Sequence, residues 1–292
     1  MRLWRASSWW AWQRSSLALP AFLLIWRRSD VTEARKVVID CGGSSTRLGI
    51  VEPGGVRLVK QVRTTSYDEF VSAIRSVDPC PIVLSVSLAG FVDRSSGFVR
   101  LSRAAPWARG TFAQRLSADL HCPVSVMNDG DAHAMSMLAI GGIELGAVAV
   151  SLGTSVGIGV VGRDRKLISP ASGENWDLGE WRLDTRATNR DLWWALGSAG
   201  LFELEKNLGV KAGRVQFGYR LGAFLSRLTC FFQMKTVVLS GGIAQSHWGV
   251  IKVPLREELR NVPDHYAPPR VMLSPYVEAG LAGAAHRITL GF

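Results

Sequence analysis

The chain has 292 residues, which is enough to bury a substantial core in one large domain or in two of ordinary size. A hydrophobic fraction of 47% with 20% charged residues is typical of a globular protein and excludes wholesale disorder. The net charge of +10 does not single out nucleic acid, because outside residues 1–30 it is spread without long basic runs. An anionic small ligand accounts for that charge equally well.

Residues 1–30 differ from the rest of the chain. They hold five of the eleven tryptophans, and their apolar stretch, residues 17–26, contains Pro20 and is too short to span a bilayer. We interpret them as an extension outside the fold, as a start codon assigned too early would give, with a membrane-surface anchor as the alternative. The four cysteines form no local ligand pair, so we expect a reduced, cytoplasmic protein.

The first chemical motif is residues 37–51, VVIDCGGSSTRLGIV, in which two apolar runs flank a carboxylate and a tip of small residues. This pattern predicts a β-hairpin whose tip can present backbone N–H groups to a phosphate. Asp40 ends an apolar strand, where a carboxylate is costly to bury without a partner. Beside a phosphate we expect that partner to be Mg²⁺, and the alternative is hydrogen bonding within the turn.

A second copy of the motif spans residues 148–168, VAVSLGTSVGIGVVGRDRKLI. Each copy predicts a hairpin that continues into a third strand and carries hydroxyl side chains at its first turn. A unit that is used twice indicates two similar halves facing each other. Two facing turns of this kind would hold a polyphosphate from both sides.

Between the copies, PVSVMNDGDAHAMSML (residues 123–138) predicts a short buried strand that ends at Asn128 and Asp129 and leads into a helix. Open α/β sheets place their chemistry at such carboxyl ends of strands, so Asp129 is the candidate general base. Its alternative role is the N-cap of the helix, and both roles can hold together. Asp131 and His133 lie nearby, and the pattern assigns neither a function.

Two further stretches follow the second copy. SPASGENWDLGEWRLDT (residues 169–185) is an acidic loop with tryptophan, which suits a polyhydroxylated ligand, and either Glu174 or Glu180 is equally well explained as a solvated carboxylate. TVVLSGGIAQS (residues 236–246) predicts a strand before Gly241 and Gly242, where backbone can approach a flat ligand. The intervening residues 190–232 have helical spacing, and their aromatic residues suit a core.

In this order the motifs resemble the sugar kinase, Hsp70 and actin superfamily. IDCGGSSTRLGIVE resembles its first phosphate loop, SLGTSVGIGVV its second, VVLSGGIA its adenosine motif and GLAGAA its closing helix. Within the superfamily, AGFVDRSSGFVRLSRAAPW followed by CPVSVMNDGDAHA is similar to the ROK family of carbohydrate kinases. The resemblance runs from about Val37 to Ala285.

The resemblance implies an α/β fold of two similar actin-like, ribonuclease H-like domains with a nucleotide cleft between them. We place the domains at residues 31–140 and 141–292, with the last helix able to return to the first domain. It also implies ATP and Mg²⁺ as cofactors, a sugar or cyclitol as the other small-molecule partner, no nucleic acid or membrane, and frequent homodimers. The implied activity is transfer of the γ-phosphoryl group of ATP to a sugar hydroxyl.

Carried over by position, the resemblance assigns Asp129 as the base, Asp40 to Mg²⁺, and Asn128, Gly90 and one of Glu174 and Glu180 to the acceptor. It assigns the nucleotide to Gly42, Gly43, Ser44, Ser45, Thr46, Gly153, Thr154, Ser155, Gly241 and Gly242.

Two departures from the family pattern matter. ROK kinases usually have a Gly-Glu-x-Gly-His motif and many carry a cysteine-rich zinc loop, whereas SGENWDLGEW has no histidine and the zinc loop is absent. We therefore expect no structural zinc, we favour Glu180 over Glu174, and we widen the acceptor from glucose to an amino sugar, an N-acylated sugar or a cyclitol. One alternative is a sugar-responsive repressor, but such repressors carry an N-terminal helix-turn-helix, which residues 1–30 do not resemble. The other alternative is a non-catalytic sugar sensor.

Overall fold

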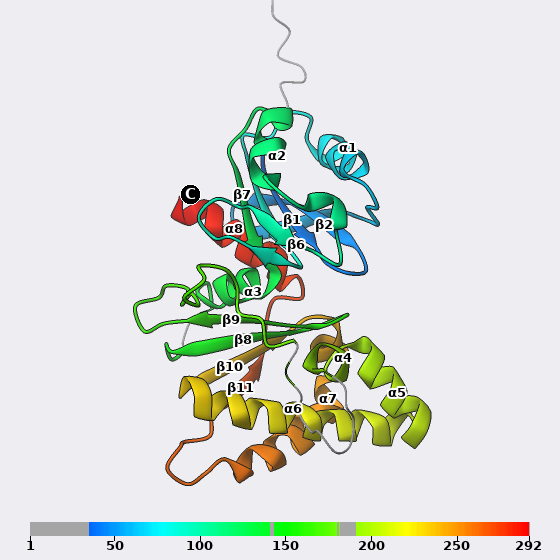
Figure 1. Cartoon of the computed structure of the whole chain (residues 1–292), viewed down its shortest axis with the longest axis vertical. Coiled ribbons are helices and arrows are strands. Elements are labelled where there is room, and N and C mark those ends of the chain that lie inside the picture. Colours follow the sequence, from blue (N-terminus) through cyan, green and yellow to red (C-terminus); the bar gives the residue numbers. More distant parts are fainter. Residues whose placement is uncertain (1–34, 141–142, 180, 182–190, 292) are drawn as a thin grey trace, which may run out of the picture. The chain divides into compact units, whose positions relative to one another are not determined.

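Two β-sheets with matching strand order form the centre of the chain (Figure 1). The computed structural model describes residues 35–140, 143–179, 181 and 191–291. The predicted extension, residues 1–30, and Glu180 lie outside these described residues. Within the described part, none of the helices combines the length and apolarity that a membrane span requires.

The first sheet has five strands in the order β3-β2-β1-β4-β7. Its strands are β1 (Lys36–Cys41), β2 (Thr46–Glu52), β3 (Gly55–Val62), β4 (Val83–Leu88) and β7 (Val124–Asn128). The strand β2 lies between β1 and β3 and is antiparallel to both, and β4 lies parallel to both β1 and β7. The predicted first hairpin and its third strand are therefore present. A separate pair of short strands, β5 (Phe91–Val92) and β6 (Val99–Leu101), follows β4.

The second sheet has four strands in the order β11-β10-β8-β9. Its strands are β8 (Ala147–Leu152), β9 (Val156–Val161), β10 (Thr236–Ser240) and β11 (Arg270–Leu273). An antiparallel hairpin followed by two parallel strands repeats the arrangement of β2-β1-β4-β7. The expected third strand after this hairpin is reduced to one bridge between Val161 and Leu167, and Pro170, which has no N–H group to donate to a strand ladder, follows three residues later.

Helices cover the outer face of each sheet (Figure 1). On the first sheet these are α1 (Tyr67–Val77) and α2 (Phe112–Leu120), which follows the short helix η1 (Pro106–Ala108). On the second sheet α6 (Val210–Phe232) and α7 (Gly242–Glu258) pack together, preceded by α4 (Leu192–Ala195) and α5 (Ser198–Leu208) and followed by η2 (Leu259–Asn261). Each layer has its own core, with Phe70 and Phe112 in the first and Phe217 and Phe224 in the second.

Two helices lie between the sheets, α3 (Asp129–Met137) and α8 (Ala279–Leu290) (Figure 1). The helix α3 packs on β8, β9 and α8, and α8 packs on β1 and β4 of the first sheet. Glycines permit this closeness, since a Cβ on Gly159 of β9 would lie 2.2 Å from the carbonyl oxygen of Gly130, and one on Gly283 of α8 would lie 1.7 Å from that of Ala132. Backbone packing therefore fixes the start of α3.

Candidate active site

The site begins where β7 ends and α3 starts. Asn128 is the N-cap of α3, because its side-chain oxygen accepts hydrogen bonds from the backbone N–H groups of Gly130 at 2.8 Å and Asp131 at 3.3 Å. Its amide group donates to the carbonyl oxygen of Gly90 at 2.7 Å and to Oδ1 of Asp129 at 2.9 Å. The capping role therefore falls on Asn128, and Asp129 stands in the first turn, held by its neighbour.

Two adjoining cavities share Asp129 and Ser155 in their linings. The larger one, of about 1330 Å³, contains every predicted nucleotide-binding residue except Thr46, and it also contains Asp40. Thr46 instead lines a third cavity on the other side of the first loop. The smaller cavity of the adjoining pair, of about 670 Å³, contains Asn128 and Gly90. The predicted nucleotide residues other than Thr46 thus line one cavity and Asn128 and Gly90 line the other, with Asp129 and Ser155 at the junction.

The tips of the two hairpins meet in the larger cavity. The hydroxyl oxygens of Ser44 and Thr154 are 2.9 Å apart. A Cβ on Gly43 would lie 3.1 Å from Oγ1 of Thr154, so a residue with a side chain would crowd this contact. Among the described residues, the backbone N–H groups of Gly43 and Ser44 have no acceptor. The first tip therefore leaves backbone donors free to bind an anion, beside the paired hydroxyl groups of Ser44 and Thr154.

Gly241 and Gly242 form another wall of the larger cavity. Gly241 has a φ of +87°, and a Cβ there would lie 2.5 Å from the carbonyl oxygen of Leu152, so both the conformation and the space require glycine. The helix α7 begins at Gly242, and the N-terminus of a helix favours a negatively charged ligand.

Asp40 is buried in the same cavity with two protein partners. Ser87 donates to Oδ1 at 2.9 Å, and Nη1 of Arg47 donates to Oδ2 at 3.2 Å. These partners come from β4 and β2 and not from the turn that follows Asp40. Each carboxylate oxygen has one donor, which leaves lone pairs for a hard cation.

The chemistry of this set fits Mg²⁺. The ion is commonly held by one or two carboxylates together with phosphate oxygens and water. Among the described residues no group of three or more His, Cys, Asp or Glu side chains gathers to form a complete metal site. Asp40 would therefore hold the ion only in company with a phosphate-bearing ligand.

Asp129 has the electrostatics of a base that works near neutral pH. Burial, together with the negative charge of Asp40, raises the pKa of the Asp129 carboxyl from 3.8 to about 7. Its Oδ2 lies 3.6 Å from the point that a Cβ on Gly157 would occupy, so a side chain at position 157 would stand directly beside this oxygen. A hydroxyl group in the smaller cavity can reach this carboxylate.

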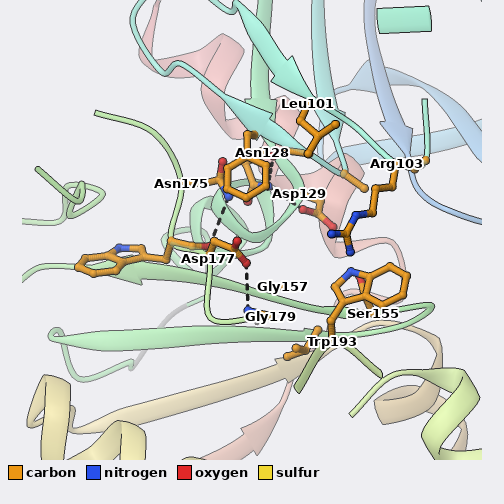
Figure 2. Close-up of a pocket in the computed structure, with 16 residues that line it drawn as sticks. Leu101, Arg103, Asn128, Asp129, Ser155, Gly157, Asn175, Asp177, Gly179 and Trp193 are labelled. Atoms are coloured by element: carbon orange, nitrogen blue, oxygen red, sulfur yellow. Dashed lines mark hydrogen bonds between the residues drawn. The ribbon is translucent and has the colours of Figure 1, made fainter. Parts of the chain in front are cut away.

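Polar and aromatic groups surround the smaller cavity (Figure 2). Asn175 and Asp177 lie on one side of Asp129, and Arg103 and Trp193 lie on the other. The guanidinium carbon of Arg103 is 5.5 Å from the centre of the Trp193 ring. Amide, carboxylate and guanidinium groups beside aromatic rings can bind the hydroxyl groups and the apolar faces of a sugar-like ring.

The residues predicted to bind the acceptor do not all line the smaller cavity. Asn128 and Gly90 line the smaller cavity, whereas Glu174 forms an ion pair with Arg100 and lines neither of the adjoining cavities. Glu180 lies outside the described residues. The roles of all these residues stay predictions.

Sequence reasoning did not name several residues of this cavity, among them Arg103, Asn175, Asp177 and Trp193. The first three lie within stretches already singled out, LSRAAPW and SGENWDLGEW, where polar residues in an aromatic loop were the available signal.

Comparison with known proteins finds both sequence and structural matches. The sequence model of the ROK family matches residues 36–189. A glucokinase of Streptomyces coelicolor is 27% identical over 133 residues, and the match spans 42% of this chain and 42% of the glucokinase. The chain thus aligns with less than half the length of this curated relative.

Solved structures resemble the chain over most of its length. A ROK family glucokinase from Streptomyces griseus in complex with glucose and AMPPNP has 18% identity and a TM-score of 0.74, over 86% of this chain and 98% of that one. A ROK family transcriptional regulator, a homolog of the E. coli MLC protein, has 15% identity and a TM-score of 0.72, over 86% of this chain and 77% of that one. With the duplicated sheets, these likenesses confirm the expected actin-like α/β fold.

Proposed function

The chain belongs to the ROK family, and from this premise we propose that it is an ATP-dependent kinase for a sugar or a sugar-like acceptor. The observation that carries the proposal is the position of Asp129, in the lining of both the nucleotide-sized cavity and the smaller polar cavity. A carboxylate at such a junction can act on a hydroxyl group on one side while a phosphate chain occupies the other.

In the proposed reaction Asp129 takes the proton of an acceptor hydroxyl group. The hydroxyl oxygen forms a bond to the γ-phosphorus of ATP, the bond from that phosphorus to the bridging oxygen breaks, and ADP leaves. The pKa of about 7 suits this task, because a base whose pKa lies near the working pH is about half ionised and still able to accept a proton.

The two hairpin tips and Asp40 prepare the donor side. Backbone N–H groups and hydroxyl groups around Ser44 and Thr154 would bind the phosphates and hold them in line with the acceptor. Asp40 would bind Mg²⁺, which neutralises phosphate charge when it is present. Ser87 and Arg47 fix the orientation of the Asp40 carboxylate for that role.

The acceptor class follows from the smaller cavity. Amide and carboxylate groups beside Trp176 and Trp193 suit a ring with several hydroxyl groups. The glucokinase from Streptomyces griseus binds glucose, but this chain lacks the histidine of the usual family motif. We therefore include amino sugars, N-acylated sugars and cyclitols beside glucose.

The test measures ADP release from ATP with and without Mg²⁺ against a panel of these compounds. One or more should give turnover, and Asp129→Asn should retain ATP binding while its kcat falls by about 10²- to 10⁴-fold. Asp264→Asn, which changes an exposed loop carboxylate, serves as the matched control. Full turnover by the Asp129→Asn enzyme would exclude this residue as the base.

A second candidate is a non-catalytic ROK sensor that binds a sugar without phosphorylating it. The structural likeness to a ROK family transcriptional regulator supports this second candidate. The presence of both Asp40 and Asp129 in the cavities favours the kinase, since a sensor needs neither a base nor a metal carboxylate. Sugar binding measured by calorimetry, with no ADP release under any condition, would identify the sensor.

A further inference from the structure

His133 lines the larger cavity, although no step of the proposed reaction uses this residue. It follows Asp129 by four residues on α3, so the two side chains share one face of the helix. It is 8% exposed, and the exposed part belongs to the lining of the larger cavity. A buried imidazole in a cavity suited to phosphates therefore needs an explanation.

The two ring nitrogens of His133 have different surroundings. Nδ1 is 2.6 Å from Oγ of Ser240, the last residue of β10. Among the described residues no group forms a hydrogen bond with Nε2, and this atom is not fully enclosed by the protein. Nε2 therefore opens to the cavity that the residue lines.

Ser240 can set the tautomer of this ring. A serine hydroxyl that donates to Nδ1 leaves the ring proton on Nε2, the nitrogen that opens to the cavity. Burial lowers the pKa of His133, which favours the neutral ring. The charged groups that act on the ring are Asp40, which raises its pKa, and Arg47, which lowers it.

The chemistry of the neighbours indicates the occupant. Mg²⁺ prefers oxygen ligands, so a ring nitrogen is better suited to donate a hydrogen bond than to hold that ion. Asp40 and Asp129 mark the end of the cavity where the transferred phosphoryl group has to lie, since Asp129 also lines the acceptor cavity. A donor on the Asp129 face of α3 suits the phosphates of that end.

We propose that Nε2–H of His133 donates a hydrogen bond to a nucleotide phosphate beyond the first, with Ser240 as the residue that positions the ring. The inference rests on the proposed function, because it needs a nucleoside triphosphate in this cavity. It assigns a role to a residue that the sequence pattern left without one.

The test compares the affinities of ATP, ADP and AMP for the full chain by calorimetry in the presence of Mg²⁺. His133→Ala should weaken ATP and ADP binding about 10- to 100-fold, the range for one hydrogen bond to a charged group, and change AMP binding by less than about twofold. His133→Gln, whose amide can still donate, should recover most of the loss. His265→Ala, in an exposed loop, is the control.

A separate readout tests Ser240. The ¹⁵N chemical shifts of the His133 ring should report a proton on Nε2 in the wild-type protein and a mixture of tautomers in Ser240→Ala. A proton on Nδ1 in the wild-type protein would overturn the proposed donor.

The outcomes separate the inference from the function on which it rests. Unchanged ATP affinity in His133→Ala, or equal losses for ATP and AMP, would overturn the role of His133 and leave the kinase proposal standing. A wild-type protein that binds no adenine nucleotide would overturn both. If the alanine variant does not fold, His133→Gln and His133→Leu, which differ in the donor and not greatly in size, give the same comparison.

Discussion

Replacing Asp129 by asparagine should stabilise the protein while it removes the proposed base. The Asp129 carboxyl is partly enclosed at the junction of the cavities, and its pKa rises from 3.8 to about 7 because burial and the charge of Asp40 disfavour the ionised form. Asparagine has nearly the same shape and no charge. The variant therefore keeps the packing of α3 and loses only the unfavourable ionisation.

The sign and size follow from proton linkage. A pKa that is higher in the folded state than in the unfolded state means that the folded protein binds the proton more tightly. The loss of stability caused by ionising Asp129 is therefore absent below pH 3.8, grows as the pH rises towards 7 and is complete above pH 7. Between pH 5 and pH 8 the linkage gives at most about 2.5 kcal/mol, which we reduce to about 1 to 2 kcal/mol because solvent reaches part of the carboxylate.

Urea unfolding of the wild-type protein and of Asp129→Asn at the two pH values measures this difference. The gain in free energy of unfolding of Asp129→Asn should be larger at pH 8 than at pH 5 by about 1 to 2 kcal/mol. Asp264→Asn, in an exposed loop, should show no such pH-dependent gain. An Asp129→Asn variant that is no more stable than the wild type at pH 8 would refute the reasoning.

Three further predictions concern the same site and its support. The value of kcat/KM should rise as the pH increases through about 7 and level off above it, because Asp129 acts only when ionised; a pH–rate profile with a good acceptor measures this. Gly280→Ala places a Cβ 2.6 Å from Cγ of Asp40, so calorimetry should show ATP binding in Mg²⁺ weakened by about tenfold or more. Arg94→Ala removes the guanidinium that donates to both oxygens of the fully buried Asp131, at 2.6 and 2.5 Å, so the free energy of unfolding should fall by about 3 to 5 kcal/mol. The double variant Arg94→Ala/Asp131→Asn should recover part of that loss in the same urea unfolding experiment.

The local features of the site could be predicted from the sequence. Apolar runs on either side of small-residue tips specify hairpins, because the strand periodicity and the turn residues both lie within about ten residues of sequence. Both hairpins are present, at Cys41–Thr46 and at Leu152–Val156. The third strand after the second hairpin is expected by analogy with the first, whereas the structure has a bridge between Val161 and Leu167 in its place, with Pro170 shortly after.

The partners of Asp40 could not be predicted in the same way. The sequence offered Mg²⁺ or the adjacent turn, whereas the observed donors are Arg47 and Ser87. Both lie directly opposite Asp40 in the sheet, Arg47 on β2 and Ser87 on β4. The pairing with Ser87 joins residues far apart in the sequence, and it depends on the order and register of parallel strands, which no local pattern specifies.

The choice between Asn128 and Asp129 as helix cap shows how tertiary contacts decide a chemical role. Both residue types cap helices well, and the sequence pattern offered Asp129 as the cap, whereas the structure gives that role to Asn128. The parallel pairing of β4 with β7 extends to Leu88 opposite Asn128, which keeps Asn128 extended and lets its side chain turn back over the first N–H groups of α3. Gly130 then packs directly on β9, where a Cβ would lie 2.5 Å from the carbonyl oxygen of Ile158. The glycine after Asn-Asp is thus required by the approach of two backbones, and this approach carries the Asp129 carboxylate into the junction of the cavities.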